Sequence, residues 1–193
     1  MQPTEAPMST ALDTITAKKP RRADALRNYE ALLAAAREAF AASGTDASLE
    51  DVARRAGVGI GTLYRNFPAR DDLIEAVYVS EIEALAAVAD EVRNDAAWPA
   101  LTRWLDRFVD YIGTKRVLIE AMNRDSEVMA ACRTAMYEAG GPVLARAQAE
   151  GVARDDVDVI DVVRMVAGVA GVQADPDQRR RLVDVAIDGL RAR

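Results

Sequence analysis

The sequence predicts an all-α fold. Apolar side chains recur every three or four residues along most of the chain, and no segment shows the strict alternation of a half-buried β-strand. Half of the 193 residues are hydrophobic, which is enough for one large core or two small ones. Capping residues and glycines divide the periodic pattern into about nine helices. We therefore expect a helical protein of two domains.

The N-terminal part predicts one helix of ordinary length followed by two short ones. The first carries an apolar stripe that ends at Phe40. Ser48, with Asp51 three residues later, supplies an N-cap and a near capping box for the second helix, which Gly57 ends. The third covers about residues 59–66 and stops before a proline, because the residue preceding proline avoids the helical region. Such short helices need tertiary support.

Six further helices are expected downstream. Gly113 should end the fifth, and the Gly-Gly-Pro run at 140–142 should kink or break the seventh, since proline has no amide hydrogen to donate. Asp158 and Asp175 are expected to cap the last two. The six cover about residues 70–94, 99–113, 115–122, 126–149, 159–171 and the segment from 176 onward.

Charge is divided unevenly along the chain. Residues 18–70 carry ten Lys or Arg and six acidic residues, whereas residues 71–193 carry fifteen and twenty-three, and the whole chain has a net charge of −6. A local basic surface beside an acidic body suits a protein that reads DNA, while overall acidity argues against a nonspecific coat of nucleic acid. The basic segment at 18–22 is interpreted as a solvated tail rather than a minor-groove arm.

Residues 48–67 have the pattern of a helix-turn-helix unit. Gly57 lies between two short helices, where it can adopt a positive φ. Gly59 and Gly61 leave the backbone of the third helix bare, so that its amides can approach a phosphate or a base edge. Side chains with hydroxyl, amide and guanidinium groups suit the major groove, and here they are Thr62, Tyr64, Asn66, Arg54, Arg55, Arg65 and Arg70. A purely structural helix pair is the alternative.

Two segments of the sequence resemble members of a known protein family. The segment SLEDVARRAGVGIGTLYRNFPARDDLIEAV, residues 48–77, resembles the DNA-binding segment of the TetR family of bacterial transcriptional regulators. Its most specific part is the run Gly-Thr-Leu-Tyr-Arg-Asn-Phe. The segment ADPDQRRRLVDVAIDGLRAR, residues 174–193, is similar to the C-terminal ends of some actinobacterial members.

The resemblance implies particular DNA contacts. Ser48, Thr62, Tyr64 and Arg70 would contact operator phosphates, and residues 59–62 would face base edges. The sequence departs from the common pattern at three places: arginine replaces lysine at 70, asparagine replaces histidine at 66, and glycine replaces serine or alanine at 59. The DNA-binding candidates are Ser48, Gly59, Ile60, Gly61, Thr62, Tyr64, Arg65, Asn66 and Arg70.

Aromatic and sulfur-containing side chains gather in the second half of the chain. The family resemblance implies an effector pocket among these helices, and soft apolar walls suit a small hydrophobic or aromatic molecule. An ordinary hydrophobic core is the alternative for each residue. The pocket candidates are Trp104, Phe108, Tyr111, Met122, Met129, Cys132, Met136 and Tyr137.

A second copy of the chain is expected as a partner, because one short recognition helix buries too little surface to find its site in a genome. The last two helices offer an apolar face with small residues that permit close packing. Packing within the chain is the equal alternative. The interface candidates are Val162, Val163, Val166, Val169, Leu182, Ala186 and Leu190.

Other function classes have little support. The chain has no histidine, and Cys132 has no evident base partner, so neither an enzyme nor a cofactor is expected. Asp155, Asp156, Asp158 and Asp161 lack EF-hand spacing and are interpreted as helix-capping residues, so no metal site is expected. No apolar run could cross a bilayer and no secretory signal is evident, and a single cysteine fits the cytoplasm.

The sequence thus predicts three parts: a flexible N-terminal arm (1–22), a helix-turn-helix DNA-binding domain (23–80) and a C-terminal effector-binding and dimerisation domain (81–193). We expect a ligand-responsive regulator, a repressor in preference to an activator. It would bind a palindromic operator in double-stranded DNA as a homodimer, and a small hydrophobic effector would release it. The alternatives are a constitutive DNA-binding regulator, or an activator, without a small-molecule ligand.

Overall fold

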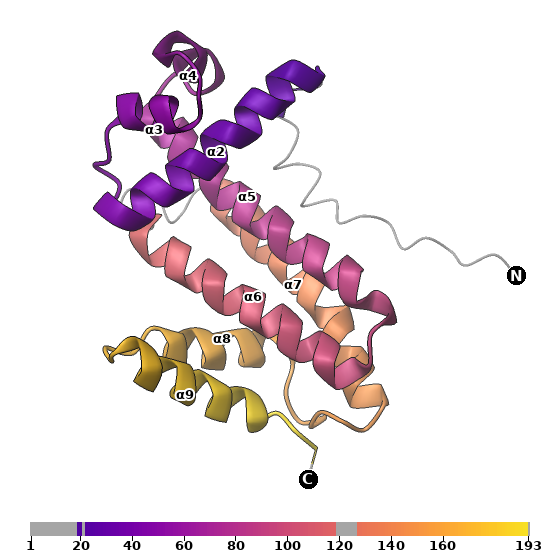
Figure 1. The fold of residues 1–193 in the computed structure, drawn as a ribbon. Helices are drawn as coiled ribbons and strands as arrows, with labels where there is room; N and C mark the ends of the chain where they lie inside the picture. The colour runs from indigo at the N-terminus through magenta and orange to yellow at the C-terminus, as the bar shows by residue number, and fades with distance from the viewer. Residues whose placement is uncertain (1–18, 21, 119–126, 193) are drawn as a thin grey trace, which may run out of the picture. The chain divides into compact units, whose positions relative to one another are not determined.

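A computed structural model describes residues 19–20, 22–118 and 127–192, and within these ranges the all-α prediction is confirmed. The helices are α2 (Ala23–Ser43), α3 (Leu49–Arg55), α4 (Ile60–Asn66), α5 (Arg70–Glu91), the 3-10 turn η1 (Val92–Asn94), α6 (Ala97–Leu118), α7 (Glu127–Ala149), α8 (Val159–Ala170) and α9 (Pro176–Asp188) (Figure 1). The described chain also contains one isolated β-bridge, between Ala153 and Arg191. None of the described helices has the length and apolarity that a membrane crossing requires.

Two predicted interruptions are absent from these helices. α6 continues through Gly113 to Leu118, so no separate helix begins at 115. α7 is continuous past Pro142, so of the kink or break expected at 140–142 the break is not observed. In both places buried neighbours hold the helix, among them Ile112 before the glycine and Val143 after the proline. Tertiary burial of a helix face routinely outweighs the local cost of a glycine or proline.

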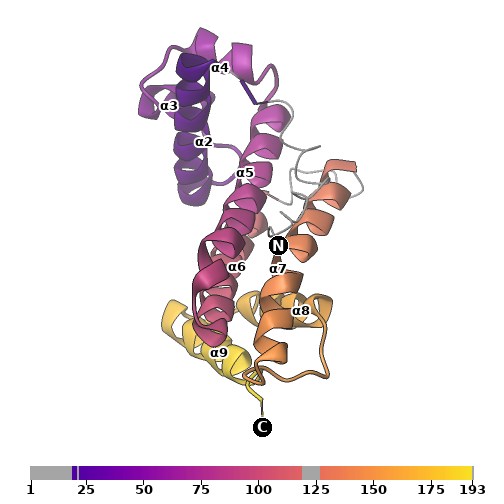
Figure 2. The same ribbon diagram turned by 90° about the vertical axis from the view of Figure 1, so that its right-hand side faces the viewer.

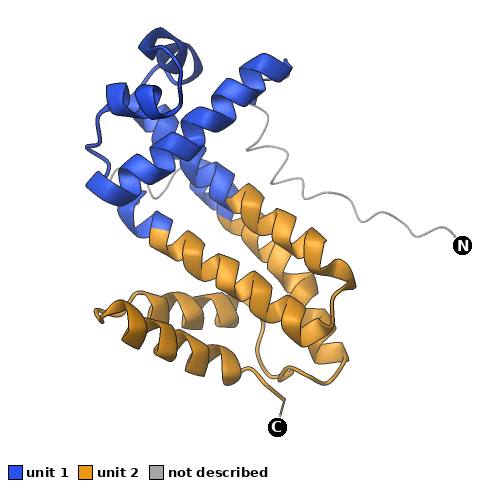
Figure 3. Cartoon of the chain, viewed as in Figure 1, with its two compact units in different colours: residues 1–81, 114–132 blue, residues 82–113, 133–193 orange. Residues whose placement is uncertain are grey.

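The chain divides into two compact units (Figure 3). Residues 1–81 with 114–132 form the first, and residues 82–113 with 133–193 form the second. Three helices, α5, α6 and α7, each begin in one unit and end in the other.

The first unit has an apolar core contributed by four helices. Its fully buried side chains include Leu32 and Phe40 of α2, Val52 of α3, Leu63 of α4 and Leu73 of α5. Burying side chains of this size is worth about 1.5–3 kcal/mol each. This shared core is what holds the seven-residue helices α3 and α4, which would not be stable alone.

A buried ion pair also crosses the first unit. Glu81 of α5 is 2% exposed and pairs with the Arg37 guanidinium of α2. Arg37 also donates to the Ser80 hydroxyl at 3.2 Å, and Ser80 donates to the Val77 carbonyl at 2.7 Å. Breaking a buried pair leaves an uncompensated charge. The pair therefore ties α2 to α5 in one arrangement.

In the second unit α8 and α9 pack side by side (Figures 1 and 2). Their predicted caps are confirmed. Asp158 accepts from the Asp161 amide at 2.9 Å and its own amide donates back to the Asp161 carboxylate, which completes a capping box. Asp175 accepts from the Gln178 amide at 2.8 Å, with Pro176 at the first helical position.

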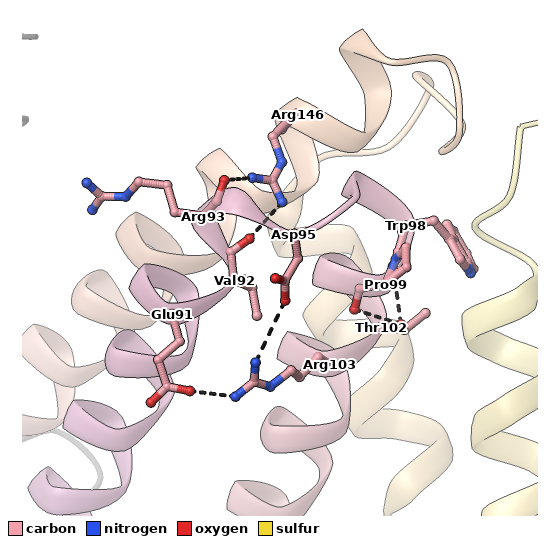
Figure 4. Close-up of polar contacts among 9 residues, drawn as sticks. All are labelled: Glu91, Val92, Arg93, Asp95, Trp98, Pro99, Thr102, Arg103 and Arg146. Atoms are coloured by element: carbon pink, nitrogen blue, oxygen red, sulfur yellow. Dashed lines mark hydrogen bonds and ion pairs between the residues drawn. The ribbon is translucent and has the colours of Figure 1, made fainter.

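Polar side chains fix the turn between α5 and α6 (Figure 4). Arg146 of α7 donates to the carbonyl oxygens of Val92, at 3.0 Å, and Arg93. Arg103 of α6 pairs with Glu91 at 2.6 Å and lies 3.7 Å from the Asp95 carboxylate. These contacts hold the η1 turn against both α6 and α7.

Close packing of α6 on α7 depends on Gly140. A Cβ atom at Gly140 would lie 2.3 Å from Cη2 of Trp104, whereas one at Gly141 would meet nothing within 4 Å. Gly140→Ala is therefore expected to destabilise the protein by about 1–3 kcal/mol through overpacking. Gly141→Ala should stabilise it by roughly 0.5–1 kcal/mol, as alanine usually does in a helix. Urea unfolding of both variants tests this, and equal midpoints would contradict the packing.

Candidate DNA-binding surface

The helix-turn-helix predicted at 48–67 is formed by α3, α4 and the turn between them. Gly57 has a φ of 69°, the left-handed conformation expected for it. The Gly57 amide donates to the Arg54 carbonyl at 3.1 Å, and the Val58 amide donates to the Ala53 carbonyl at 3.0 Å. Ala53 is buried, and because its side chain is small, α3 can approach its neighbours closely. The turn is thus fixed by its own backbone.

Ser48 caps α3, as predicted. Its hydroxyl accepts from the Asp51 amide at 3.3 Å and donates to the Glu50 carboxylate at 2.8 Å. The pKa of Glu50 is lowered, chiefly by a backbone hydrogen bond to its carboxylate and then by this hydroxyl. Ser48 is exposed, so the same residue can cap the helix and meet a phosphate.

Asp51 forms ion pairs with two arginines of its own helix, α3. Arg55 donates to its carboxylate at 2.6 Å, and Arg54 pairs with the other carboxylate oxygen. Hydrogen bonds from Arg55 and then Arg54 lower the pKa of Asp51. These two cations therefore contribute to the local potential while engaged within their own helix.

This carboxylate makes the stability of the first unit depend on pH. Because the pKa of Asp51 is lower in the folded chain, its contribution is fully present above the ordinary aspartate pKa of about 3.9 and is lost as the pH falls through the lower folded-state pKa. Asp51→Asn should lower the urea midpoint at pH 6, and the gap to the parent should narrow steadily as the pH is lowered into the acid range. A gap that stays constant across this range would show that ionisation of Asp51 is not the cause.

The outer face of α4 exposes large side chains. Ile60 is 37% exposed and Tyr64 is 46% exposed, while Leu63 between them is fully buried. Gly59 and Gly61 are exposed, and a Cβ at either would meet nothing within 4 Å. One side of this helix therefore packs and the other meets solvent.

Thr62 connects the polar groups of α4. It is half-buried, and its hydroxyl accepts from the exposed Arg65 guanidinium at 2.9 Å. Asn66 donates to the Thr62 carbonyl at 2.8 Å. Arg65 is thereby oriented by its own helix, and one N–H group of the Asn66 amide is engaged by the backbone.

Arg70 has a role that the sequence did not indicate. Its Nη1 donates to the carbonyl oxygens of Thr45, at 2.6 Å, and Ala47, at 2.7 Å. These carbonyls belong to the loop between α2 and α3, which follows Gly44 with a φ of 71°. Arg70 thus ties the start of α5 to the loop that positions α3. No local signal reveals such a contact, because its partners are more than twenty residues away.

Two stretches of the chain match known regulators. Residues 32–77 match the model of bacterial regulatory proteins of the tetR family, and residues 96–192 match the C-terminal domain of SbtR-like transcriptional regulators. The crystal structure of the TetR transcriptional regulator SCO0520 from Streptomyces coelicolor is 36% identical, covers 85% of this chain and 98% of its own, and has a TM-score of 0.74. The chain belongs to the TetR family of transcriptional regulators.

Other relatives of this TetR-family regulator match different shares of its chain. The TetR regulator from Mycobacterium vanbaalenii is 31% identical, covers 90% of this chain and 100% of its own, and has a TM-score of 0.71. The HTH-type transcriptional regulator SAR0097 of Staphylococcus aureus is 29% identical over 100 residues, which are 46% of this chain and 52% of that one. LfrR from Mycobacterium smegmatis, solved with proflavine, shares the fold at 23% identity and a TM-score of 0.64, over 83% of this chain and 92% of its own.

Most pocket candidates of the regulator are buried. Trp104, Phe108, Tyr111, Met129, Cys132 and Met136 are buried, Tyr137 is half-buried, and Met122 lies outside the described residues. Met129 and Cys132 belong to the first unit and the other described candidates to the second. Their role in effector binding stays a prediction.

The interface candidates divide into two groups. Val162, Val163, Val166 and Leu190 are buried within the regulator, Val169 and Ala186 are half-buried, and Leu182 is 38% exposed. Three exposed apolar residues were not predicted: Met165, Val172 and Val185. Leu182 and Val185 are three residues apart on α9, which is a helical spacing, whereas Val172 follows the end of α8. The spacing on α9 could have been found from the sequence, but the more apolar stripe of the same helix was preferred.

Proposed function

We propose that this TetR-family regulator is a repressor that binds an inverted-repeat operator as a homodimer and is released by a small-molecule effector. The observation that carries the proposal is the outer face of α4. Ile60 and Tyr64 project into solvent beside Arg65, on a helix whose inner face is anchored by Leu63. Exposed apolar and cationic groups on a fixed helix suit the major groove.

The residues of this face divide into two roles. Ile60 and Thr62, near the start of α4, would meet base edges and set sequence preference. Tyr64, and Ser48 on the neighbouring helix, would meet phosphates and set the register of the protein on the duplex. Arg70 would do so through its remaining N–H groups, because a guanidinium has five and its Nη1 serves the loop carbonyls.

Dimerisation would use the exposed apolar side chains of the second unit. Met165 lies on α8, Val172 follows it, and Leu182 and Val185 lie on α9. Gly168, exposed on α8 with open space at its Cβ position, would let a second α8 approach closely. A twofold contact of this face with its own copy would present two α4 helices to successive half-sites.

Effector binding would take place in the C-terminal part and act as a population shift. A hundredfold loss of operator affinity requires only about 2.7 kcal/mol of differential effector binding between two states. The helices that carry the pocket candidates, α6 and α7, continue into the unit that contains α4. The complex of LfrR with proflavine supports a small molecule as a ligand for this fold.

Selection from a randomised duplex library tests the proposal. The purified regulator should enrich an inverted repeat, and fluorescence anisotropy across a salt series should give a steep salt dependence. Ile60→Glu, a substitution on the exposed face, should remain folded and enrich nothing. Compounds are then screened for loss of binding to the enriched duplex. Absence of any enriched repeat overturns the proposal, whereas a repeat that no compound releases supports a constitutive regulator.

A further inference from the structure

The buried aromatic side chains of α6 form one continuous row in the second unit. Trp104 and Phe108 stack with ring centroids 6.0 Å apart and an interplanar angle of 6°. Phe108 and Tyr111 lie 5.7 Å apart at 36°. All three side chains are 1–2% exposed. These three side chains are three of the four aromatic pocket candidates.

The position of the Trp104 ring is fixed from α7. Its six-membered ring lies against Gly140, where a Cβ atom would approach Cη2 to 2.3 Å and Cζ2 to 2.5 Å. A glycine inside a helix has a conformational cost, which alanine would avoid. The packing of the Trp104 indole against α7 therefore requires a glycine at position 140.

The indole nitrogen of Trp104 is a buried donor without an acceptor. Nε1 is inaccessible to solvent, and it has no hydrogen-bond partner in the described part of the chain. An indole N–H can only donate, and buried donors in native proteins nearly always have a partner. Phenylalanine at this position would supply an aromatic ring without an N–H. The chain thus keeps an unpaired donor in the core of the unit that should bind the effector.

We infer that Trp104 selects the effector: its indole N–H donates a hydrogen bond to an acceptor on a small, planar, uncharged molecule that packs beside the aromatic row. The inference rests on the proposed effector function and specifies its chemistry. A ligand with an acceptor would satisfy the N–H on entering the core, and a hydrocarbon of the same shape would leave it unpaired. Discrimination between two such ligands is strong, because the buried N–H of the protein stays unpaired when the ligand has no acceptor.

A matched pair of probes tests this, 1-indanone and indane, which differ by one carbonyl oxygen. The two are titrated into the full-length, ¹⁵N-labelled regulator without DNA, and the indole N–H signals are followed by NMR. Trp98→Phe identifies the Trp104 signal and serves as the matched control, because Trp98 is half-buried beneath the Arg191 guanidinium, 4.2 Å from its ring. With 1-indanone the Trp104 N–H signal should move downfield. Indane should leave it without such a shift.

The affinities should follow the same pattern. The parent and Trp98→Phe proteins should bind 1-indanone at least about tenfold more tightly than indane, although indane is the more hydrophobic of the two, and Trp104→Phe should reduce the ratio to about twofold or less. Equal affinities in the parent, a preference that survives Trp104→Phe, or binding of neither probe would overturn the inference. The NMR shift on the parent needs no variant to fold. Neither readout involves DNA, so a failure here and a failure of operator binding are separate results.

Discussion

Val185→Glu is expected to abolish operator binding while each protomer remains folded. Val185 is 70% exposed on α9, so a glutamate there is fully hydrated in a single chain. In the proposed dimer the same position is buried twice, once from each copy. An uncompensated buried charge costs about 3–5 kcal/mol, which weakens the dimer by at least about a hundredfold. A monomer with one α4 helix then has only half of the recognition surface.

Sedimentation velocity and anisotropy on the enriched duplex measure the two effects together. Ala145→Glu is the matched control, since Ala145 is exposed on α7 and the substitution changes the net charge by the same amount. The control should remain dimeric and bind DNA like the parent, and both variants should keep the helical circular dichroism of the parent. A dimeric Val185→Glu protein with full DNA affinity would place the interface on another surface.

Local chemistry explains why much of the fold could be predicted. A cap needs only residues three positions apart, so Ser48 and Asp158 were visible as helix starts in the sequence. Gly57 was visible for a similar reason, because a left-handed turn between two short helices favours glycine. The family resemblance of residues 48–77 depends on the same short-range pattern.

The missed features all depend on contacts that are distant in sequence. The helical periodicity of α5 allows Glu81 to face solvent. It is nevertheless buried, and Arg37 of α2 pairs with it. Arg70 was assigned to DNA alone, but the α2–α3 loop lies within reach of its guanidinium. Gly113 lies in the interior of a helix because burial around it outweighs propensity. Sequence patterns report a residue's preferences, and tertiary partners decide among them.

Tyr64→Phe is expected to weaken DNA binding by at least about a hundredfold, without regard to DNA sequence. The substitution removes one hydroxyl from a side chain that is 46% exposed, so the fold of the first unit should be unchanged. A hydrogen bond to a charged group is worth about 1.5–3 kcal/mol, and a dimer would make two of them, one in each half-site. Phosphates carry no sequence information, so the loss should be the same on the enriched duplex and on a scrambled one.

Ile60→Ala provides the contrast that separates a phosphate contact from base reading. Ile60 is also exposed on α4, but near its first turn, where side chains would meet base edges and thymine methyl groups. Its loss should therefore be larger on the enriched duplex than on the scrambled one, and the salt dependence should remain that of the parent. The anisotropy titrations are run on both duplexes at matched salt, because affinities for DNA have meaning only at a stated salt concentration. If Tyr64→Phe instead lowered affinity for the enriched duplex alone, Tyr64 would read bases, and the division of α4 into a reading end and an anchoring end would be wrong.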